Sequence, residues 1–189
     1  MHLFLYGPRV AGKSTFLRRA LLPRQAYLAG FVVQRVMEGD EPAGFRVAQA
    51  NGSYPPLVTA YAADMDGVFI FRGRMDRSVL DEAIDAARTA SQRDGCKLIL
   101  LDEIGGIELE SPRFMSALER ILSGNKPCVG VLKSEENLRH SLSRLRLGNR
   151  CLDLRARLEE QIARNGELLE YSRAEEANIG KRLQACLGL

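Results

Sequence analysis

Short apolar runs alternate with stretches of helical periodicity along most of the chain. An apolar run over residues 2–6, ended by a Gly-Pro pair, predicts a buried first strand. Good helix formers follow over residues 13–22. Residues 29–37 and 44–47 predict two strands joined by a polar turn, the pattern of a β-hairpin, and residues 68–71 predict a further short strand.

The middle of the chain continues this alternation. Apolar residues recur at helical spacing from residue 76 to residue 94. Residues 97–101 predict a central parallel strand covered on both faces, and residues 127–132 predict another buried strand. A Ser-Pro pair begins a helix over residues 111–122 between them. Strands that alternate with helices predict an α/β fold with three layers around a mainly parallel sheet.

The C-terminal part of the sequence has a different pattern. A helical period of apolar residues occurs at Leu154, Leu158 and Ile162. Residues 151–154 are a short strand candidate, and residues 168–187 predict a second helix after an Asn-Gly stop. We therefore expect one domain over residues 1–154, and a helical tail over residues 155–189 that packs on the domain or on a partner.

The segment between the first strand and the first helix matches the phosphate-loop pattern GxxxxGK[ST] in full: Gly7, Pro8, Arg9, Val10, Ala11, Gly12, Lys13, Ser14 and Thr15. Its two outer glycines let backbone N–H groups approach phosphates, and the helix start adds the positive end of its dipole. We expect Lys13 to reach the β- and γ-phosphates, Ser14 to bind Mg²⁺ and Thr15 to contact the α-phosphate. The sequence thus predicts a P-loop NTPase fold in which these nine residues bind a nucleotide.

Two acidic residues directly follow the predicted central strand. Asp102 and Glu103 come after four apolar residues, so they lie at the carboxyl edge of the sheet, where the phosphate loop also lies. We expect Asp102 to hold Mg²⁺ and Glu103 to orient and deprotonate the attacking water. Lys13 and Glu103 are the predicted catalytic residues, and Ser14 and Asp102 are the predicted metal ligands.

Composition limits the other function classes. Formal net charge is +3, which is low for a dedicated nucleic-acid binder, and no apolar run is long enough to cross a membrane. The first residues lack the features of a secretory signal. The four cysteines are widely spaced and contain no CxxC pair, so we expect reduced thiols in a cytoplasmic protein.

Several segments together resemble the cancer-related nucleoside-triphosphatase family. They are an N-terminal phosphate loop, a hairpin with Gly30-Phe31 and Gly44-Phe45, the segment Asp102-Glu103-Ile104-Gly105 followed by Ile107-Glu108-Leu109, Phe114 in the next helix, and Val129-Gly130 in the next strand. The similarity covers about residues 1–132. It implies slow, Mg²⁺-dependent hydrolysis of ATP, GTP and other nucleoside triphosphates to the diphosphate and phosphate.

Two other functions fit the same residues. A P-loop kinase would transfer the phosphoryl group to a nucleotide or other small acceptor, and a nucleotide-dependent switch or adaptor would bind a partner through its tail helices. An arginine could complete the site in any of the three: Arg9 lies in the loop, and a basic stretch follows the last predicted strand. Its members are Lys133, Arg139, Arg144, Arg146 and Arg150. Self-association through the C-terminal helices is a further expectation.

Overall fold

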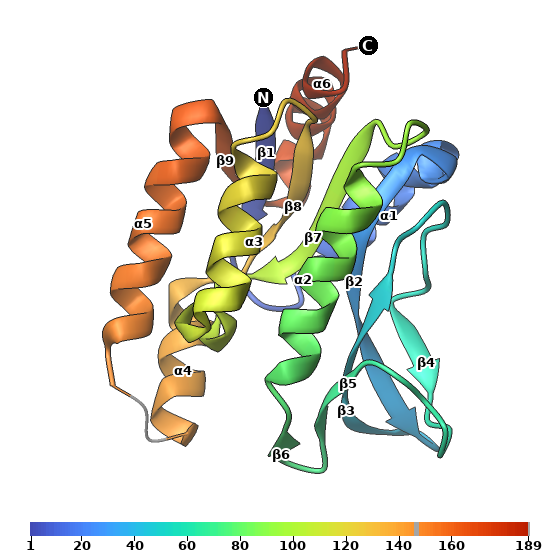
Figure 1. Cartoon of the computed structure of the whole chain (residues 1–189), viewed down its shortest axis with the longest axis vertical. Helices are drawn as coiled ribbons and strands as arrows, with labels where there is room; N and C mark the ends of the chain where they lie inside the picture. Colours follow the sequence, from blue (N-terminus) through green and yellow to red (C-terminus); the bar gives the residue numbers. More distant parts are fainter. Residues whose placement is uncertain (146–147, 189) are drawn as a thin grey trace.

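A mixed sheet runs through the computed structural model, which describes residues 1–145 and 148–188 (Figure 1). Its strands are β1 (His2–Tyr6), β2 (Leu28–Glu38), β3 (Glu41–Gln49), β4 (Val58–Ala60), β5 (Val68–Phe71), β6 (Arg74–Met75), β7 (Leu98–Ile104), β8 (Cys128–Leu132) and β9 (Gly166–Glu170). They lie in the order β6-β5-β3-β2-β7-β8-β1-β9, and β4 pairs with the far end of β2. The strands from β2 to β9 in this order are parallel, whereas β3, β5 and β6 add antiparallel pairs.

Helices cover both faces of this sheet. They are α1 (Lys13–Leu21), α2 (Ser78–Ser91), α3 (Pro112–Leu122), α4 (Glu135–Leu145), α5 (Arg150–Asn165) and α6 (Glu176–Cys186), with short 3₁₀ turns η1 (Leu22–Tyr27), η2 (Ile107–Glu110) and η3 (Arg173–Glu175). One apolar cluster joins the sheet to α2, α3, α4 and α5, and a second joins its other face to α1 and α6. The three-layer α/β architecture predicted from the sequence is confirmed (Figure 1).

The predicted elements of the first 145 residues are present. The hairpin is β2 and β3, which pair antiparallel from Phe31 opposite Gln49 to Glu38 opposite Glu41. The Ser-Pro start of α3 is a true cap, because the Ser111 hydroxyl accepts a hydrogen bond from the Phe114 N–H at 3.3 Å. The hairpin and the helix cap are specified by residues that are close together in the chain, so the sequence alone was enough to predict them.

The C-terminal segment differs from its prediction in two places. Residues 151–154 are not a strand; they form the first turns of α5. The helix predicted over residues 168–187 is wrong in its first part, since Gly166–Glu170 is strand β9, paired in parallel with β1. The α-helix in this range is α6, which follows the short 3₁₀ turn η3, and its Ile179 and Leu183 are buried against the sheet. The segment after residue 155 therefore adds a strand as well as helices.

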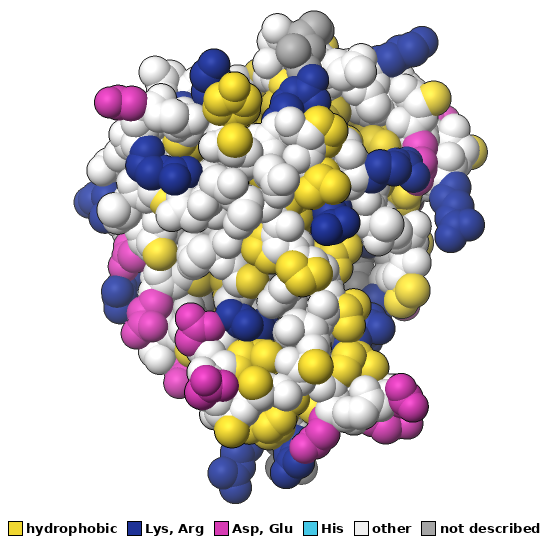
Figure 2. All heavy atoms as spheres, turned by 90° about the vertical axis from the view of Figure 1, so that its right-hand side faces the viewer, with side chains coloured by type: hydrophobic (Ala, Val, Ile, Leu, Met, Phe, Trp, Pro, Cys, Tyr) yellow, Lys and Arg dark blue, Asp and Glu magenta, His cyan; other side chains and the backbone are white. Residues whose placement is uncertain are grey.

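The surface of the molecule mixes apolar and charged side chains. Figure 2 shows the side on which α1 and the hairpin lie; hydrophobic side chains emerge there between scattered lysines and arginines, and acidic side chains lie mainly in its lower half. Large exposed apolar side chains include Val10, Tyr27, Val58 and Tyr61. Among the described residues, none of the helices has the length and apolar character to span a membrane.

Candidate active site

The phosphate loop connects the buried strand β1 to α1 at the carboxyl edge of the sheet. Gly12 has φ 103°, a left-handed conformation that a side chain would strain, and it directly precedes the first residue of α1. Lys13 is buried, and its Nζ donates to the carbonyl oxygens of Gly7 at 3.0 Å and Pro8 at 2.6 Å. The lysine is thus folded back along the loop, in the position from which it can meet a phosphate that the loop encloses.

Ser14 and Asp102 meet although 88 residues separate them. The Ser14 hydroxyl donates to Asp102 Oδ1 at 2.8 Å, and the Val33 N–H donates to Oδ2 at 3.4 Å. Asp102 is 1% exposed; burial, and secondly the charge of Glu103, raises its pKa to about 7.

The donor set fits Mg²⁺. A hydroxyl and a carboxylate are the oxygen ligands that this hard cation prefers, and Mg²⁺ commonly keeps water and substrate phosphate in its remaining positions. The two hydrogen bonds that Asp102 accepts come from uncharged groups, so a divalent cation would offset the cost of burying its charge. Ser14 and Asp102 are therefore the residues that would hold the metal.

Glu103 lies on the open side of this arrangement. Its side chain is exposed, and its φ of 57° is unusual for a residue with a side chain. The pairing of β7 with β8 shifts register between Leu101 and Ile104, and at this irregularity Glu103 lines a cavity of about 270 Å³. The predicted site residues on that cavity are Arg9, Val10, Gly12, Lys13, Ser14, Thr15, Asp102 and Glu103. Gly7, Pro8 and Ala11 shape the loop without lining the cavity.

The pKa of Lys13 depends on its burial and on the two acidic residues near the loop. Burial lowers the pKa of the Lys13 ammonium, while the nearby negative charges of Glu103 and Asp102 act in the opposite direction. The lysine and two carboxylates therefore form one electrostatic unit. A nucleotide–Mg²⁺ complex, which brings both signs of charge, complements it.

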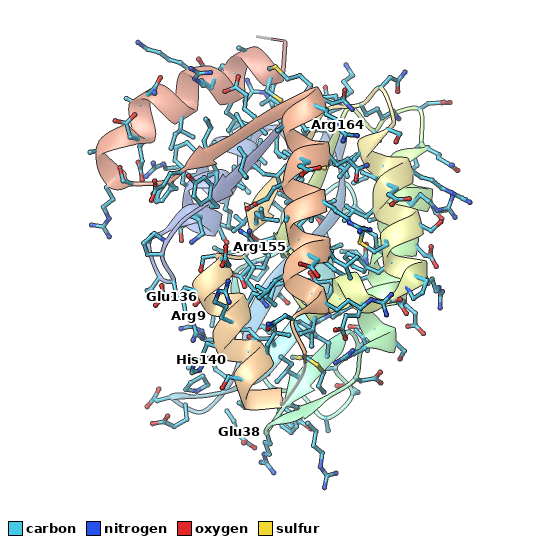
Figure 3. All side chains as sticks on the ribbon, turned by 90° about the vertical axis from the view of Figure 1, so that its left-hand side faces the viewer. Arg9, Glu38, Glu136, His140, Arg155 and Arg164 are labelled. Carbon is cyan, nitrogen blue, oxygen red and sulfur yellow. The ribbon has the colours of Figure 1, made fainter. Side chains whose placement is uncertain are left out.

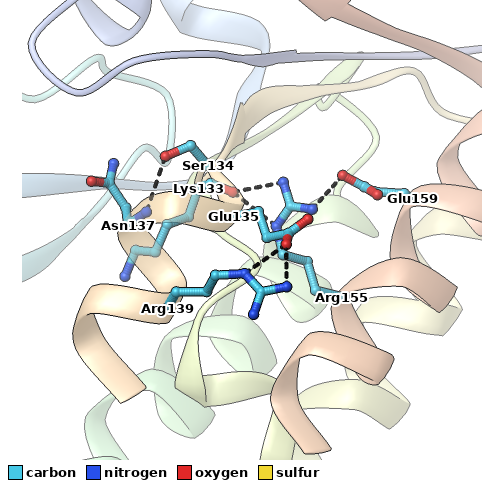
Figure 4. A network of polar contacts seen from close by, with 7 residues as sticks. All are labelled: Lys133, Ser134, Glu135, Asn137, Arg139, Arg155 and Glu159. Carbon is cyan, nitrogen blue, oxygen red and sulfur yellow. Dashed lines mark hydrogen bonds and ion pairs between the residues drawn. The ribbon is translucent and has the colours of Figure 1, made fainter. Parts of the chain in front are cut away.

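Among the members whose side chains the structure describes, the predicted basic stretch supplies one residue beside the site, Lys133, rather than a cluster at the loop. Lys133 lies next to the site, whereas Arg139 pairs with Glu135 on the outside of α4 (Figure 4). Arg155, which the sequence did not single out, is buried and donates twice to the Lys133 carbonyl, at 3.0 and 2.9 Å, and once to Glu159. Arg146 and the side chain of Arg144 lie outside the described part of the chain.

Comparison with known proteins agrees with this geometry. The profile of the NTPase family matches residues 2–163. The chain belongs to this family. Among its relatives, the nucleoside-triphosphatase THEP1 of Ignicoccus hospitalis is 33% identical over 150 residues, which are 75% of this chain and 82% of that one. The human cancer-related nucleoside-triphosphatase is 30% identical over 133 residues, 65% of this chain and 69% of that one.

Solved structures of NTPase-family members share the fold. The crystal structure of THEP1 from Aquifex aeolicus superposes with a TM-score of 0.61 at 18% identity, over the whole of both chains. The solution structure of a human cancer-related nucleoside triphosphatase superposes with a TM-score of 0.60 at 21% identity, over 98% of this chain and 96% of that one. The family resemblance and the P-loop NTPase fold inferred from the sequence are confirmed.

Sequence reasoning missed one support of the phosphate loop in this NTPase. Tyr171 follows β9 and is buried; a Cβ on Gly12 would lie 3.3 Å from its hydroxyl, and its ring packs on Phe16 with centroids 5.7 Å apart. The Tyr171 N–H donates to the Tyr6 carbonyl at 2.9 Å, and its hydroxyl donates to Glu176 at 2.5 Å. No local pattern marks this residue, because its role depends on the pairing of β9 with β1.

Proposed function

We propose that this protein hydrolyses nucleoside triphosphates, ATP and GTP among them, to the diphosphate and phosphate in a Mg²⁺-dependent reaction. The observation that carries the proposal is the meeting of Lys13, the Ser14–Asp102 pair and Glu103 on one cavity at the mouth of a phosphate loop. Two relatives of the chain are named nucleoside-triphosphatases, which supports the same reaction.

Each residue has a distinct role in the proposed mechanism. The loop N–H groups and the start of α1 bind the phosphates, and the Lys13 ammonium stabilises charge on the transferring group. Ser14 and Asp102 would be the protein ligands of Mg²⁺, which when bound would neutralise charge at the phosphates. Glu103 orients a water molecule and accepts its proton as the water oxygen attacks the γ-phosphorus.

The arrangement favours broad use of nucleotides. The loop residues on the phosphate cavity recognise charge and shape rather than a base. The apolar side chains beside them have no hydrogen-bonding group that could select one base; they are Val33, Phe45, Leu57 and Val58. The aromatic rings of Tyr27, Tyr54 and Tyr61 are not on the phosphate cavity: Tyr54 is in the core, and Tyr27 and Tyr61 are on the surface. The four buried, unpaired cysteines fit a reducing compartment, and we place the reaction in the cytoplasm.

Phosphate release from a panel of nucleoside triphosphates, with Mg²⁺ and no acceptor, tests the proposal. We expect release from several nucleotides, and a loss of at least about 10²-fold in Lys13→Ala, because one charged donor to the transferring group is removed. Lys181→Ala is the matched control, since Lys181 is exposed on α6 far along the chain from the loop. No release by the unaltered protein would leave a switch or a transferase, and unchanged release by folded Lys13→Ala would remove the phosphate loop from the reaction.

A further inference from the structure

A second cavity of about 170 Å³ adjoins the phosphate cavity. The two share walls: Arg9 from the loop, Phe45 from β3, and Asp102 and Glu103 from the end of β7 line both. The second cavity extends from Glu103 away from Lys13 and Ser14, toward α2, α3 and α4. Glu103 therefore lies at the boundary between the place for the phosphates and a further space.

Aromatic side chains form a large part of the walls of this second cavity, beside polar ones that include the buried Glu108. Four of the seven phenylalanines of the chain line it: Phe31, Phe45, Phe69 and Phe114. They come from β2, β3, β5 and α3, and the rings of Phe45 and Phe69 are 6.5 Å apart and tilted. A cavity of ~150 Å³ with apolar walls holds a benzene molecule, so the volume here suits one planar ring.

The mouth of the second cavity is polar and charged. Lys133, Asn137 and His140 line it from the end of β8 and from α4, and Arg9 lies on the α4 side of the loop (Figure 3). Within residues 1–145 and 148–188, neither Arg9 nor Lys133 forms an ion pair. Charged groups at the entrance distinguish this space from a packing defect of the core, which would be closed and apolar.

The wall at α4 is held in place by the rest of the fold. The Ser134 hydroxyl accepts from the Asn137 N–H at 3.3 Å and so begins α4 directly after β8 (Figure 4). Arg155 of α5 holds the Lys133 carbonyl from behind with two hydrogen bonds. The second cavity is therefore a built feature. Eight elements (β2, β3, β5, β7, α2, η2, α3 and α4) contribute to its walls. It is the kind of concave, largely apolar site that takes a small molecule.

We propose that the second cavity binds a small alcohol with a single planar ring, and that this alcohol accepts the γ-phosphoryl group of the nucleotide. The ring lies among the phenylalanines, and the hydroxyl reaches Glu103. The alcohol oxygen forms a bond to the γ-phosphorus, the bond from that phosphorus to the β–γ bridging oxygen breaks, and the hydroxyl proton passes to Glu103. The products are a phosphate monoester and the nucleoside diphosphate.

This inference rests on the proposed function for the binding of the nucleotide, but it makes a separate claim about the second reactant. Glu103 would act on water when the second cavity is empty and on the alcohol when it is full. A bound ring also displaces water from beside the γ-phosphate. Hydrolysis should then fall as transfer rises, because a well-oriented hydroxyl competes with an effective molarity of ~10⁵ M or more.

Benzyl alcohol and toluene are the matched probes. Both fit one ring in the cavity, and only the first carries a hydroxyl. We expect saturable shifts of the Ile70 and Ile104 methyl NMR signals with dissociation constants of about 1 mM for such small ligands. With ATP and Mg²⁺, ³¹P NMR should show benzyl phosphate forming at least as fast as free phosphate. Toluene should slow phosphate release and give no new ester.

Two variants test whether the alcohol binds in the second cavity. Ile70→Trp fills the cavity from β5 and should abolish both the Ile104 methyl shift and benzyl phosphate formation. Phe71→Trp, one residue further along β5, is the control, because Phe71 stacks on the exposed Tyr61 and lies off the cavity; it should keep both signals. If Ile70→Trp does not fold, Leu80→Phe from α2 serves the same purpose.

The possible results test three claims separately: that the second cavity binds a ligand, that this ligand accepts the phosphoryl group, and that the protein hydrolyses nucleotides. Phosphate release without methyl shifts would overturn the second cavity as a ligand site while leaving hydrolysis intact. Methyl shifts without benzyl phosphate would overturn the acceptor role. An ester that Ile70→Trp forms as fast as Phe71→Trp would place the alcohol elsewhere. Absence of both phosphate and ester in the unaltered protein would instead refute the proposed function.

Discussion

Replacing Glu103 with glutamine removes a base and leaves the shape of the side chain unchanged. Glu103 is exposed on the phosphate cavity, whereas the neighbouring Asp102 is 1% exposed and bonded to Ser14. The substitution therefore leaves the contacts that bind the nucleotide in the ground state, namely Lys13, Ser14 and the loop N–H groups. General-base assistance contributes about 10²–10⁴-fold, or about 3–5 kcal/mol of barrier, and we expect turnover to fall by that factor.

The assay measures nucleotide affinity and single-turnover hydrolysis on the same Glu103→Gln preparation. Affinity should change by less than about threefold, because ground-state binding does not use the base. Glu110→Gln is the matched control: Glu110 follows in the same region of the chain, pairs with Arg77 at 3.1 Å and lines neither cavity. It should hydrolyse nucleotide at the unaltered rate.

Two results would refute the reasoning about Glu103. A hydrolysis rate within about twofold of the unaltered protein would reject it as the group that positions water. Equal losses of affinity and rate would instead assign it to the metal or to the loop, because an interaction present in both the ground state and the transition state lowers both.

Three further predictions concern the metal, the loop and the last strand. Asp102→Asn should raise the Mg²⁺ concentration for half-maximal turnover at least about tenfold, because one ligand charge is lost; an unchanged Mg²⁺ titration would place the metal elsewhere. Tyr171→Ala should lower the free energy of unfolding by about 3–5 kcal/mol in denaturant unfolding and weaken nucleotide binding, because the ring behind Gly12 is removed. Unaltered nucleotide affinity in the folded variant would show that Tyr171 does not support the loop. Deleting residues 167–189 removes β9 and the buried faces of α6, and the thermal midpoint should fall by at least about 10 °C; equal stability would show that this segment does not pack on the sheet.

The meeting of the loop with the acidic end of β7 could be predicted from the sequence because the signals for both are local. The loop pattern lies between a strand and a helix that short-range preferences specify, and Asp102 and Glu103 follow a strand of four consecutive apolar residues. Parallel strands end at the same edge of a sheet, so two such signals sufficed to place Ser14 beside Asp102. Their contact required no knowledge of the remaining fold.

The C-terminal segment was predicted less well because its determinants are distant. Buried positions of α5 recur at Cys151, Arg155, Leu158 and Ile162. Because an arginine interrupts this apolar series, the helical period was visible from Leu154 onward but not in the first turn. The burial of Arg155 depends on the carbonyl of Lys133, which is 22 residues away in the chain.

Strand β9 and the second cavity also depend on distant residues. Leu168 and Leu169 pack on opposite faces of the sheet, as strand residues do, but two adjacent leucines suit a helix equally well. Only the pairing with β1 decides between the two structures. The second cavity depends in the same way on four phenylalanines that lie on four different elements.

The place of β1 in the sheet sets the order in which the protein can acquire its ligand during synthesis. β1 emerges from the ribosome before its neighbours, but the strands that flank it are β8 and β9, which end at Leu132 and Glu170. The loop that follows β1 also rests on Tyr171. Pairings between segments so far apart in the chain form late and slowly. During synthesis the phosphate-loop residues are therefore made well before their supports, and they can hold a nucleotide only after β9 and Tyr171 have also been translated.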